Sequence, residues 1–260
     1  MTSRAMLEIE DVHLAFGGLR AVAGATFTVK TGAICALIGP NGAGKTTLFN
    51  VISGFYRADR GRIALDGDSI FGRPAHAIAR RGLVRTFQIT KVLGGISVLD
   101  NMMLGAPKQP GESIPKLLLG PRGARRREAN VRQQALETLD IVGLRSHADA
   151  YADTLSGGHR KLLEFGRALM TEPKVMLLDE PMAGINPTLG RQLLDLVAEM
   201  RATSGTTFLF VEHDMDVVMQ RSDHVVVMAN GAVIAQGPPD VVRREPAVID
   251  AYLGARHKER

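Results

Sequence analysis

A glycine-rich segment between two apolar segments constrains the fold of this chain more than any other feature. Residues 33–38 form a short, continuously apolar run, which predicts a strand buried on both faces of a sheet. A helix is predicted from Thr46 to Ser53, and the residues between match the pattern G-x-x-x-x-G-K-[ST]. Because glycines leave backbone N–H groups unobstructed at a helix start, this strand, loop and helix predict a segment that wraps around a polyphosphate.

The loop itself supplies the first part of a candidate nucleotide site. Lys45 stands where an ammonium group can bridge the β- and γ-phosphates, and Thr46 stands where a hydroxyl can bind Mg²⁺. The alternative is an ordinary glycine-rich turn that binds no nucleotide. The strand predicted before the loop and the helix predicted after it argue against that alternative. The predicted nucleotide-binding residues are Gly39, Pro40, Asn41, Gly42, Ala43, Gly44, Lys45, Thr46 and Thr47.

A second buried strand ends on two acids, in the sequence V-M-L-L-D-E at 175–180. One carboxylate at a strand end can hold Mg²⁺, directly or through water, and an adjacent one can orient and deprotonate the attacking water. We assign the first role to Asp179 and the second to Glu180. An apolar strand followed by a capping Asp is common, so this pattern gains its weight from the phosphate loop.

The order of predicted elements sets the fold class. Alternating apolar residues predict antiparallel strands over 7–29 and a second hairpin over 61–70. Residues 97–170 are predicted to be mainly helical, with Ser97 as an N-cap. Beyond Pro173 strands alternate with helices, which indicates a parallel, doubly wound core. The predicted strands are 174–178, 206–211, 224–229 and 232–236, and the predicted helices are 188–203 and 214–221.

Composition limits the setting in which this chain works. A length of 260 residues allows one large domain or two small ones. The single cysteine, Cys35, lies in the apolar run 33–38 and has no disulfide partner, so a reducing compartment is expected. Acidic residues near the N-terminus exclude a signal peptide, and no apolar run approaches the ~18 residues of a membrane helix. We therefore expect a cytoplasmic chain that reaches a membrane only through a partner.

The positive charge is concentrated in one segment. Lys and Arg number 32 and Asp and Glu 27, which gives a formal net charge of +5. Residues 121–132 carry five arginines against the single Glu128, at the start of a helix predicted over about 122–142. Such a segment could meet nucleic acid, anionic lipid or an acidic partner, and it could equally be a solvated helix face.

A third motif separates this chain from nucleotide kinases and GTPases, which share the first two. Residues 155–161, L-S-G-G-H-R-K, open a helix far along the chain from the phosphate loop. They present a second set of backbone N–H groups and the Ser156 hydroxyl to an anion. A chain with one site already built at its phosphate loop needs this second set only as part of a dimer. The alternative is a serine-capped helix after a Gly-Gly turn.

Five motifs follow one another along the chain: G-P-N-G-A-G-K-T-T at 39–47, R-T-F-Q at 85–88, L-S-G-G-H at 155–159, V-M-L-L-D-E at 175–180 and V-E-H-D at 211–214. Together they resemble an ABC transporter ATP-binding subunit, and the resemblance covers nearly the whole chain. The sequences I-A-R-R-G-L-V-R-T-F-Q, D-E-P-M-A-G-I-N-P and P-A-V-I-D-A-Y-L-G are similar, more narrowly, to the ATPase subunits of branched-chain amino acid importers.

The resemblance implies a head-to-tail dimer, with each ATP held between the phosphate loop of one subunit and Ser156, Gly157 and Gly158 of the other. It implies that Gln88 senses Mg²⁺ and the attacking water, and that His213 bonds the γ-phosphate and positions the water. Phe16 would stack on adenine, although it could equally be a core residue that closes the first hairpin.

Two residues depart from the family pattern. His159 stands where the signature commonly has Gln, and Asn186 stands where the loop after Glu180 commonly has Asp. Histidine still donates a hydrogen bond but can titrate near neutral pH, and asparagine keeps the hydrogen-bonding shape without the charge. Neither change argues against hydrolysis.

The resemblance implies an α/β fold: a P-loop NTPase (RecA-like) core with an N-terminal antiparallel β subdomain and an inserted helical subdomain over about 88–166. The ATPase domain would span 1–236, with a short helical tail over 237–260. We expect an ATP hydrolase at the cytoplasmic face of the cell membrane that powers an importer of branched-chain or other amino acids. Its expected cofactors are ATP and Mg²⁺, and no nucleic acid is expected.

The expected partners are a second ATPase subunit, identical or different, membrane permease subunits and, indirectly, a solute-binding protein. Two other functions stay open on sequence alone. One is the ATPase of a lipid or lipopolysaccharide exporter, and the other is a soluble ABC ATPase that acts on nucleic acid or ribosomes. The basic charge favours the soluble ABC ATPase. Proteins of that class usually carry two cassettes or a long coiled-coil insertion, and this sequence shows neither.

Overall fold

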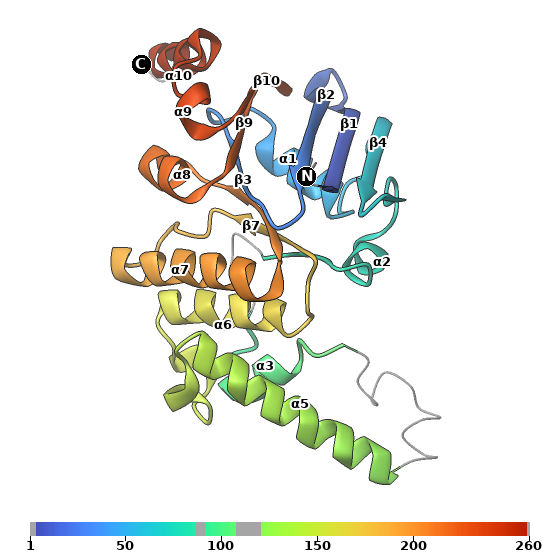
Figure 1. The fold of residues 1–260 in the computed structure, drawn as a ribbon, viewed down its shortest axis with the longest axis vertical. Helices are drawn as coiled ribbons and strands as arrows, with labels where there is room; N and C mark the ends of the chain where they lie inside the picture. The colour runs from blue at the N-terminus through green and yellow to red at the C-terminus, as the bar shows by residue number, and fades with distance from the viewer. Residues whose placement is uncertain (1–3, 87–91, 108–120, 259–260) are drawn as a thin grey trace. The chain divides into compact units, whose positions relative to one another are not determined.

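The computed structural model describes residues 4–86, 92–107 and 121–258, and the chain divides into two compact units. The first unit contains Met1–Arg85, Lys174–Pro181 and Val197–Arg260, and the second contains Thr86–Pro173 and Met182–Leu196. Figure 1 shows that the first unit carries all the strands and that helices predominate in the second.

A six-stranded sheet forms the centre of the first unit. Its strands β3, β8 and β7 consist entirely of buried residues, as their continuous apolar sequences predict. All strands are parallel to their neighbours except the edge strand β10, which runs antiparallel to β9. The order is β10 (Ala232–Gly237), β9 (His224–Ala229), β3 (Ile34–Ile38), β8 (Thr207–Val211), β7 (Val175–Asp179) and β6 (Leu83–Arg85).

A four-stranded antiparallel sheet forms the N-terminal part of the same unit. In β2 (Leu19–Lys30) buried and exposed residues alternate toward the C-terminal end, which is the pattern of a sheet with one buried face. The predicted second hairpin is confirmed as β4 (Arg60–Leu65) and β5 (Asp68–Ser69). The strand order is β2, β1 (Ala5–Phe16), β4 and β5.

One apolar core joins the two sheets of this unit. Helix α1 (Lys45–Ile52) contributes Leu48, Phe49 and Ile52, which are fully buried and belong to the same cluster as residues of both sheets. The phosphate loop is therefore followed by a helix anchored in the core. The unit also contains α2 (Ala75–Ala79), α8 (Met215–Arg221), α9 (Pro239–Val242), α10 (Pro246–Lys258) and the part of α7 (Pro187–Ser204) from Val197 onward.

The second unit is helical, as the sequence predicts for residues 97–170. Ser97 is confirmed as the N-cap of α3, because its side chain accepts a hydrogen bond from the Asp100 N–H. Its helices are α3 (Val98–Met103), α5 (Pro121–Ile141), α6 (Gly157–Leu169), the 3-10 turns η2 (Arg145–His147) and η3 (Ala152–Thr154), and the part of α7 (Pro187–Ser204) up to Leu196.

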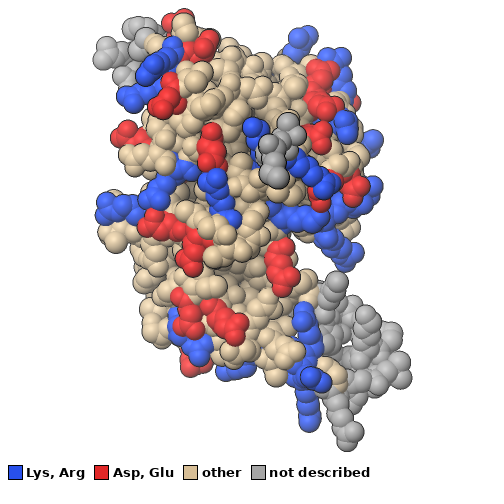
Figure 2. Space-filling model, viewed as in Figure 1, with Lys and Arg blue, Asp and Glu red and all other residues tan. Residues whose placement is uncertain are grey.

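The arginine segment lies on α5. Arg125 and Arg126 are exposed, and Arg127 donates a hydrogen bond to the Pro107 carbonyl at 3.0 Å. Figure 2 shows Lys and Arg side chains interspersed with Asp and Glu over the face in view, rather than a continuous basic surface. None of the helices in the described residues has the length and apolar character needed to cross a membrane.

Most sequence-predicted elements are confirmed within one or two residues of their ends, which is the usual uncertainty of helix and strand boundaries. Strand β6 and helix α2 were not predicted. Both are too short, at three and five residues, to show a hydrophobic period in the sequence.

Candidate nucleotide site and its family

The phosphate loop passes from the end of β3 to the start of α1, and at two of its glycines the neighbouring backbone leaves no room for a side chain. A Cβ added to Gly39 would lie 2.1 Å from the Met228 carbonyl oxygen, and one added to Gly44 would lie 2.2 Å from that of Ala21. Gly44 also has a φ of +96°, a conformation that glycine alone adopts at little cost. Glycine is therefore required at both positions by close backbone packing.

Lys45 is buried inside this loop. Its Nζ donates hydrogen bonds to the carbonyl oxygens of Gly39 at 2.8 Å and Pro40 at 3.0 Å. Desolvation lowers the pKa of Lys45, and the negative charges of Glu180 and Asp179 oppose that shift. The ammonium group is thus held at the loop by carbonyl dipoles and faces two acids, and an anionic phosphate would stabilise its charged form.

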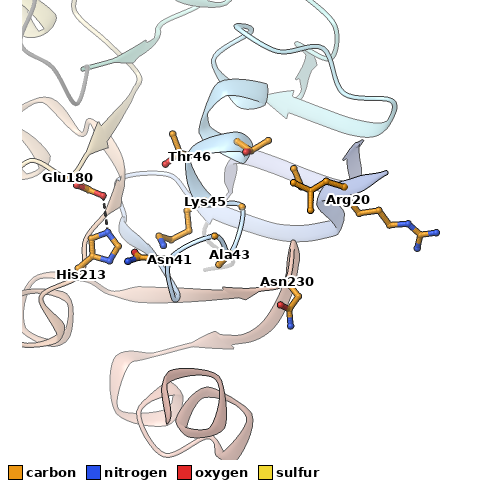
Figure 3. Close-up of a pocket in the computed structure, with 13 residues that line it drawn as sticks. Arg20, Asn41, Ala43, Lys45, Thr46, Glu180, His213 and Asn230 are labelled. Atoms are coloured by element: carbon orange, nitrogen blue, oxygen red, sulfur yellow. Dashed lines mark hydrogen bonds and ion pairs between the residues drawn. The ribbon is translucent and has the colours of Figure 1, made fainter. Parts of the chain in front are cut away.

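A pocket of the first unit opens beside the loop, and Figure 3 shows Lys45 between the Glu180 and His213 pair and the side chains of Arg20 and Asn230. Nine of the sequence-predicted site residues line it, and four other residues complete its wall. The lining residues are Leu19, Arg20, Ala21, Asn41, Gly42, Ala43, Gly44, Lys45, Thr46, Thr47, Glu180, His213 and Asn230.

The two predicted acids follow one another at the end of β7 but have different surroundings. Asp179 is the last residue of the strand, and its side chain is 1% exposed. Its Oδ2 accepts a 2.7 Å hydrogen bond from Arg85, while its Oδ1 has no hydrogen-bond partner within the described part of the chain. Glu180 leaves the strand with a φ of +48°, and non-glycine residues in this strained region concentrate at functional sites.

Glu180 meets His213 across the loops that follow two neighbouring strands. Glu180 Oε1 lies 2.8 Å from His213 Nε2, the contact drawn as a dashed line in Figure 3. The backbone supports this approach, because the Glu180 N–H donates to the Val211 carbonyl at the end of β8. Parallel strands end at the same edge of a sheet, so residues distant in sequence converge there.

The third motif lies in the second unit, where Ser156 caps α6. The Ser156 hydroxyl accepts a hydrogen bond from the His159 N–H at 3.2 Å. A Cβ on Gly158 would meet Leu189 at 2.5 Å, whereas one on Gly157 would meet nothing within 4 Å. A side chain at 158 would therefore have to displace the end of the Leu189 side chain on α7, whereas packing within this unit leaves the glycine at 157 unexplained.

The two departures from the family pattern have local contacts in the same unit. The His159 ring packs against that of His147, with ring centroids 5.2 Å apart. Asn186 Oδ1 accepts a hydrogen bond from the Thr188 N–H at 2.8 Å, at the start of α7. Asparagine thus caps this helix with the side-chain geometry expected of it.

Two other predicted site residues lie apart from the pocket or outside the described chain. The interpretation of Phe16 as a core residue is wrong, because Phe16 is 47% exposed; its ring meets that of Tyr56 edge-on, with centroids 5.4 Å apart. Gln88 lies outside the described residues.

The structure also brings residues to the site that the motifs did not indicate. Arg85 reaches Asp179, and the Tyr252 side chain of α10 lies beside the Gly39 backbone, which opposes the rise that burial causes in the Tyr252 pKa. Arg85 stands inside the R-T-F-Q motif and could have been suspected from it. Nothing in the sequence around Tyr252, Arg20 or Asn230 links them to the loop, since their contacts depend on how distant elements pack.

The chain has the parts of a P-loop nucleoside triphosphatase. Backbone N–H groups gather at Gly39–Thr47, and a strand of the adjoining sheet leads into two carboxylates. The ABC transporter family profile matches residues 22–183, and the profile of the branched-chain amino acid ATP-binding cassette transporter matches residues 232–258. The chain belongs to the ABC transporter family, in the group of branched-chain amino acid transport ATP-binding proteins.

Individual relatives match along nearly the full length. The chain is 41% identical to the high-affinity branched-chain amino acid transport ATP-binding protein BraF of Pseudomonas aeruginosa, over 97% of this chain and 99% of that protein. It is also 41% identical to the probable transport ATP-binding protein LivG of Archaeoglobus fulgidus, over 98% and 97%. LivG of Escherichia coli is 38% identical over 97% of this chain and 99% of that protein.

Solved structures agree with this family. A nucleotide-free ATP-binding cassette from an ABC transporter is 38% identical with a TM-score of 0.82, covering 96% of this chain and 99% of that one. The ADP conformation of an ATP-binding cassette of an ABC transporter is 38% identical with a TM-score of 0.83, covering 97% and 100%. The predicted fold class, an ABC nucleotide-binding domain, is confirmed.

Proposed function

We propose that this chain binds and hydrolyses ATP to power an importer of branched-chain amino acids. The observation that carries the substrate class is the match of residues 232–258 to the branched-chain amino acid transporter profile. That segment lies outside the phosphate loop and the acidic strand, so general ATPase character does not explain it. The names of the relatives that match along the full length support the same substrate class.

Nucleotide binding rests on the loop Gly39–Thr47. Its backbone N–H groups, the N-terminus of α1 and the Lys45 ammonium would surround the phosphates. Phe16 would stack on adenine, and its 47% exposure and position at the end of β1 leave a ring face available for this.

The residues present fit Mg²⁺, whose usual protein ligands are hard oxygens. The Thr46 hydroxyl lines the pocket, and buried Asp179 keeps one oxygen without a partner among the described residues. No group of three or more His, Cys, Asp or Glu able to hold a metal occurs in the described chain, which suits an ion bound by few side chains and by phosphate oxygens. Thr46, Asp179 and Gln88 would hold Mg²⁺, which when bound neutralises phosphate charge.

Hydrolysis then depends on Glu180 and His213. Glu180 would accept the proton of the attacking water, because it is the carboxylate that faces the pocket while Asp179 is buried. His213, 2.8 Å from Glu180, would hold that carboxylate in place and hydrogen-bond the γ-phosphate. The backbone strain at Glu180 supports a functional rather than a structural reason for its conformation.

A second ATPase subunit, identical or different, would complete each site through its Ser156, Gly157 and Gly158. Gly157 supports this role, because its missing side chain is not required by packing within its own unit. The pair would work on permease subunits at the cytoplasmic face of the membrane, with a solute-binding protein upstream.

We propose that the ATPase domain spans residues 1–236, that its helical subdomain spans about 88–166, and that residues 237–260 form a tail.

Uptake of radiolabelled leucine, isoleucine and valine tests this proposal in cells that lack the chain. We expect the wild-type chain to restore uptake and Lys45→Ala not to. Glu137→Gln, a substitution on the exposed face of α5, serves as the matched control and should restore uptake fully. Two results together would refute the transporter function. One is normal uptake in cells that lack the chain, and the other is recovery of the chain from wild-type cells on ribosomes or DNA and never with membrane permeases.

A further inference from the structure

Arg85 is a buried cation that the functions proposed above do not use. It is the last residue of β6, and its side chain is 8% exposed. Its Nη2 donates to Asp179 Oδ2 at 2.7 Å, and the Asp179 side chain is 1% exposed. Both charges are shielded from water, so loss of either partner would leave the other charge buried and uncompensated.

The other arm of the same guanidinium reaches the helix that follows the phosphate loop. Arg85 Nη1 donates to Asn50 Oδ1 at 2.6 Å and lies 3.3 Å from Ser53 Oγ, both on or next to α1. The guanidinium carbon also lies 5.7 Å from the ring centre of Phe49. Arg85 therefore connects β7, which ends on Asp179, to α1, which carries Thr46.

This connection selects one oxygen of Asp179. Because Arg85 occupies Oδ2, Oδ1 is the oxygen left for a further ligand, and it is buried without a partner among the described residues. The planar guanidinium joins two elements with separate N–H groups, which a lysine ammonium cannot do in the same geometry.

We propose that Arg85 is a positioning residue of the Mg²⁺ site: it orients the Asp179 carboxylate and holds it at a fixed place relative to Thr46 on α1. The inference rests on the proposed function, in which Asp179 and Thr46 hold Mg²⁺. Arg85 acts through Asp179 and does not itself touch the substrate. Residues that hold a metal ligand from behind commonly contribute about 10- to 100-fold to metal affinity.

Binding of Mn²⁺ to the full chain saturated with ADP, followed by electron paramagnetic resonance, tests this without hydrolysis. We expect Arg85→Met to weaken Mn²⁺ binding about 10-fold or more. ADP affinity measured in EDTA should stay near the wild-type value, because the phosphate loop is intact. Arg62→Met removes an exposed arginine paired with Glu10 and should change neither measurement.

A double-mutant cycle separates this inference from the proposed function. Asp179→Asn alone should weaken Mn²⁺ binding, and adding Arg85→Met to it should cause little further loss if the arginine acts through Asp179. Normal Mn²⁺ binding in Asp179→Asn would overturn the metal role of Asp179. A weakened Asp179→Asn with a normal Arg85→Met would overturn only the role of Arg85.

Arg85→Lys keeps the test decisive if Arg85→Met does not fold. Lysine keeps the charge but cannot bridge Asp179 and Asn50 together. We therefore expect Arg85→Lys to have a Mn²⁺ affinity between those of the wild type and Asp179→Asn. Wild-type Mn²⁺ affinity in folded Arg85→Lys would contradict the positioning role.

Discussion

Glu180 Oε1 and His213 Nε2 lie 2.8 Å apart, although the two residues are 33 positions apart in the chain. Each stands just beyond the end of a buried strand, β7 and β8, and these strands are parallel neighbours. The sheet therefore brings together a carboxylate and an imidazole beside the phosphate loop. Both groups line the same pocket as Lys45, and the proposed activation of water depends on this arrangement.

Replacement of Glu180 by glutamine should stop hydrolysis while leaving ATP bound. Glutamine keeps the shape but cannot accept the water proton, so we expect ATP turnover to fall by about 10²- to 10⁴-fold. Phosphate release and size-exclusion chromatography with ATP would measure turnover and dimer formation. The matched control Glu137→Gln should behave as wild type, and unchanged turnover in Glu180→Gln would remove Glu180 from the role of base.

ATP affinity should depend on pH through Lys45. Desolvation lowers the pKa of Lys45 from its ordinary value of 10.5, and a bound phosphate favours the ammonium form. ATP binding should therefore be strongest where Lys45 is fully protonated and weaken as pH rises through the lowered pKa, below 10.5. The free energy of unfolding of the ATP-free protein should change in the opposite sense and rise through the same window.

A titration of ATP affinity at rising pH, above the range in which ordinary carboxyl groups and histidines titrate, would measure this. Lys45→Arg provides the control, since arginine stays charged throughout. If Lys45→Arg loses ATP affinity over the same range as the wild type, the titration of Lys45 is not the cause. Lys45→Ala should weaken ATP binding at every pH.

Substitution of Gly44 should show that the phosphate loop needs space more than conformational freedom. Gly44 has a φ of +96° and Gly67 a φ of +87°, but only at Gly44 would a Cβ meet backbone, 2.2 Å from the Ala21 carbonyl oxygen. Gly67→Ala should lower the free energy of unfolding by about 1–2 kcal/mol from backbone strain alone. Gly44→Ala should lower it clearly more, in denaturant unfolding, and abolish ATP binding; equal losses would contradict this account.

Neutralising Arg125, Arg126 and Arg127 of α5 should leave catalysis unchanged. Arg125 and Arg126 are exposed, and Arg127 makes one exposed hydrogen bond to Pro107. Replacing all three by glutamine should change the free energy of unfolding by about 0.5–1 kcal/mol at most. Basal ATP hydrolysis by the purified protein should stay at the wild-type rate. A large loss would mean that this helix supports the fold or the site.

Local sequence patterns predicted the parts of the site that are continuous in the chain. The loop Gly39–Thr47 needs glycines, a lysine and a hydroxyl at set spacings, and the acids at the end of β7 follow an apolar strand. Each pattern consists of a few adjacent residues, so the sequence alone is enough to recognise it. The sequence also predicts Ser156 as the cap of α6, because that pattern likewise consists of adjacent residues. Short elements such as β6 do not show such a pattern, because three residues are fewer than the roughly four to eight over which strand alternation can be recognised.

Tertiary structure alone decided which distant residues meet. Arg85 and Asp179 are 94 positions apart, and their pairing follows from the register of β6 against β7, where Arg85 lies opposite Leu177. Register and strand order depend on how apolar faces pack over the whole sheet, and no local pattern specifies them. The sequence thus determined the chemistry of the loop and of the acids, and the packing of the sheet decided that Arg85 holds Asp179 and that His213 holds Glu180.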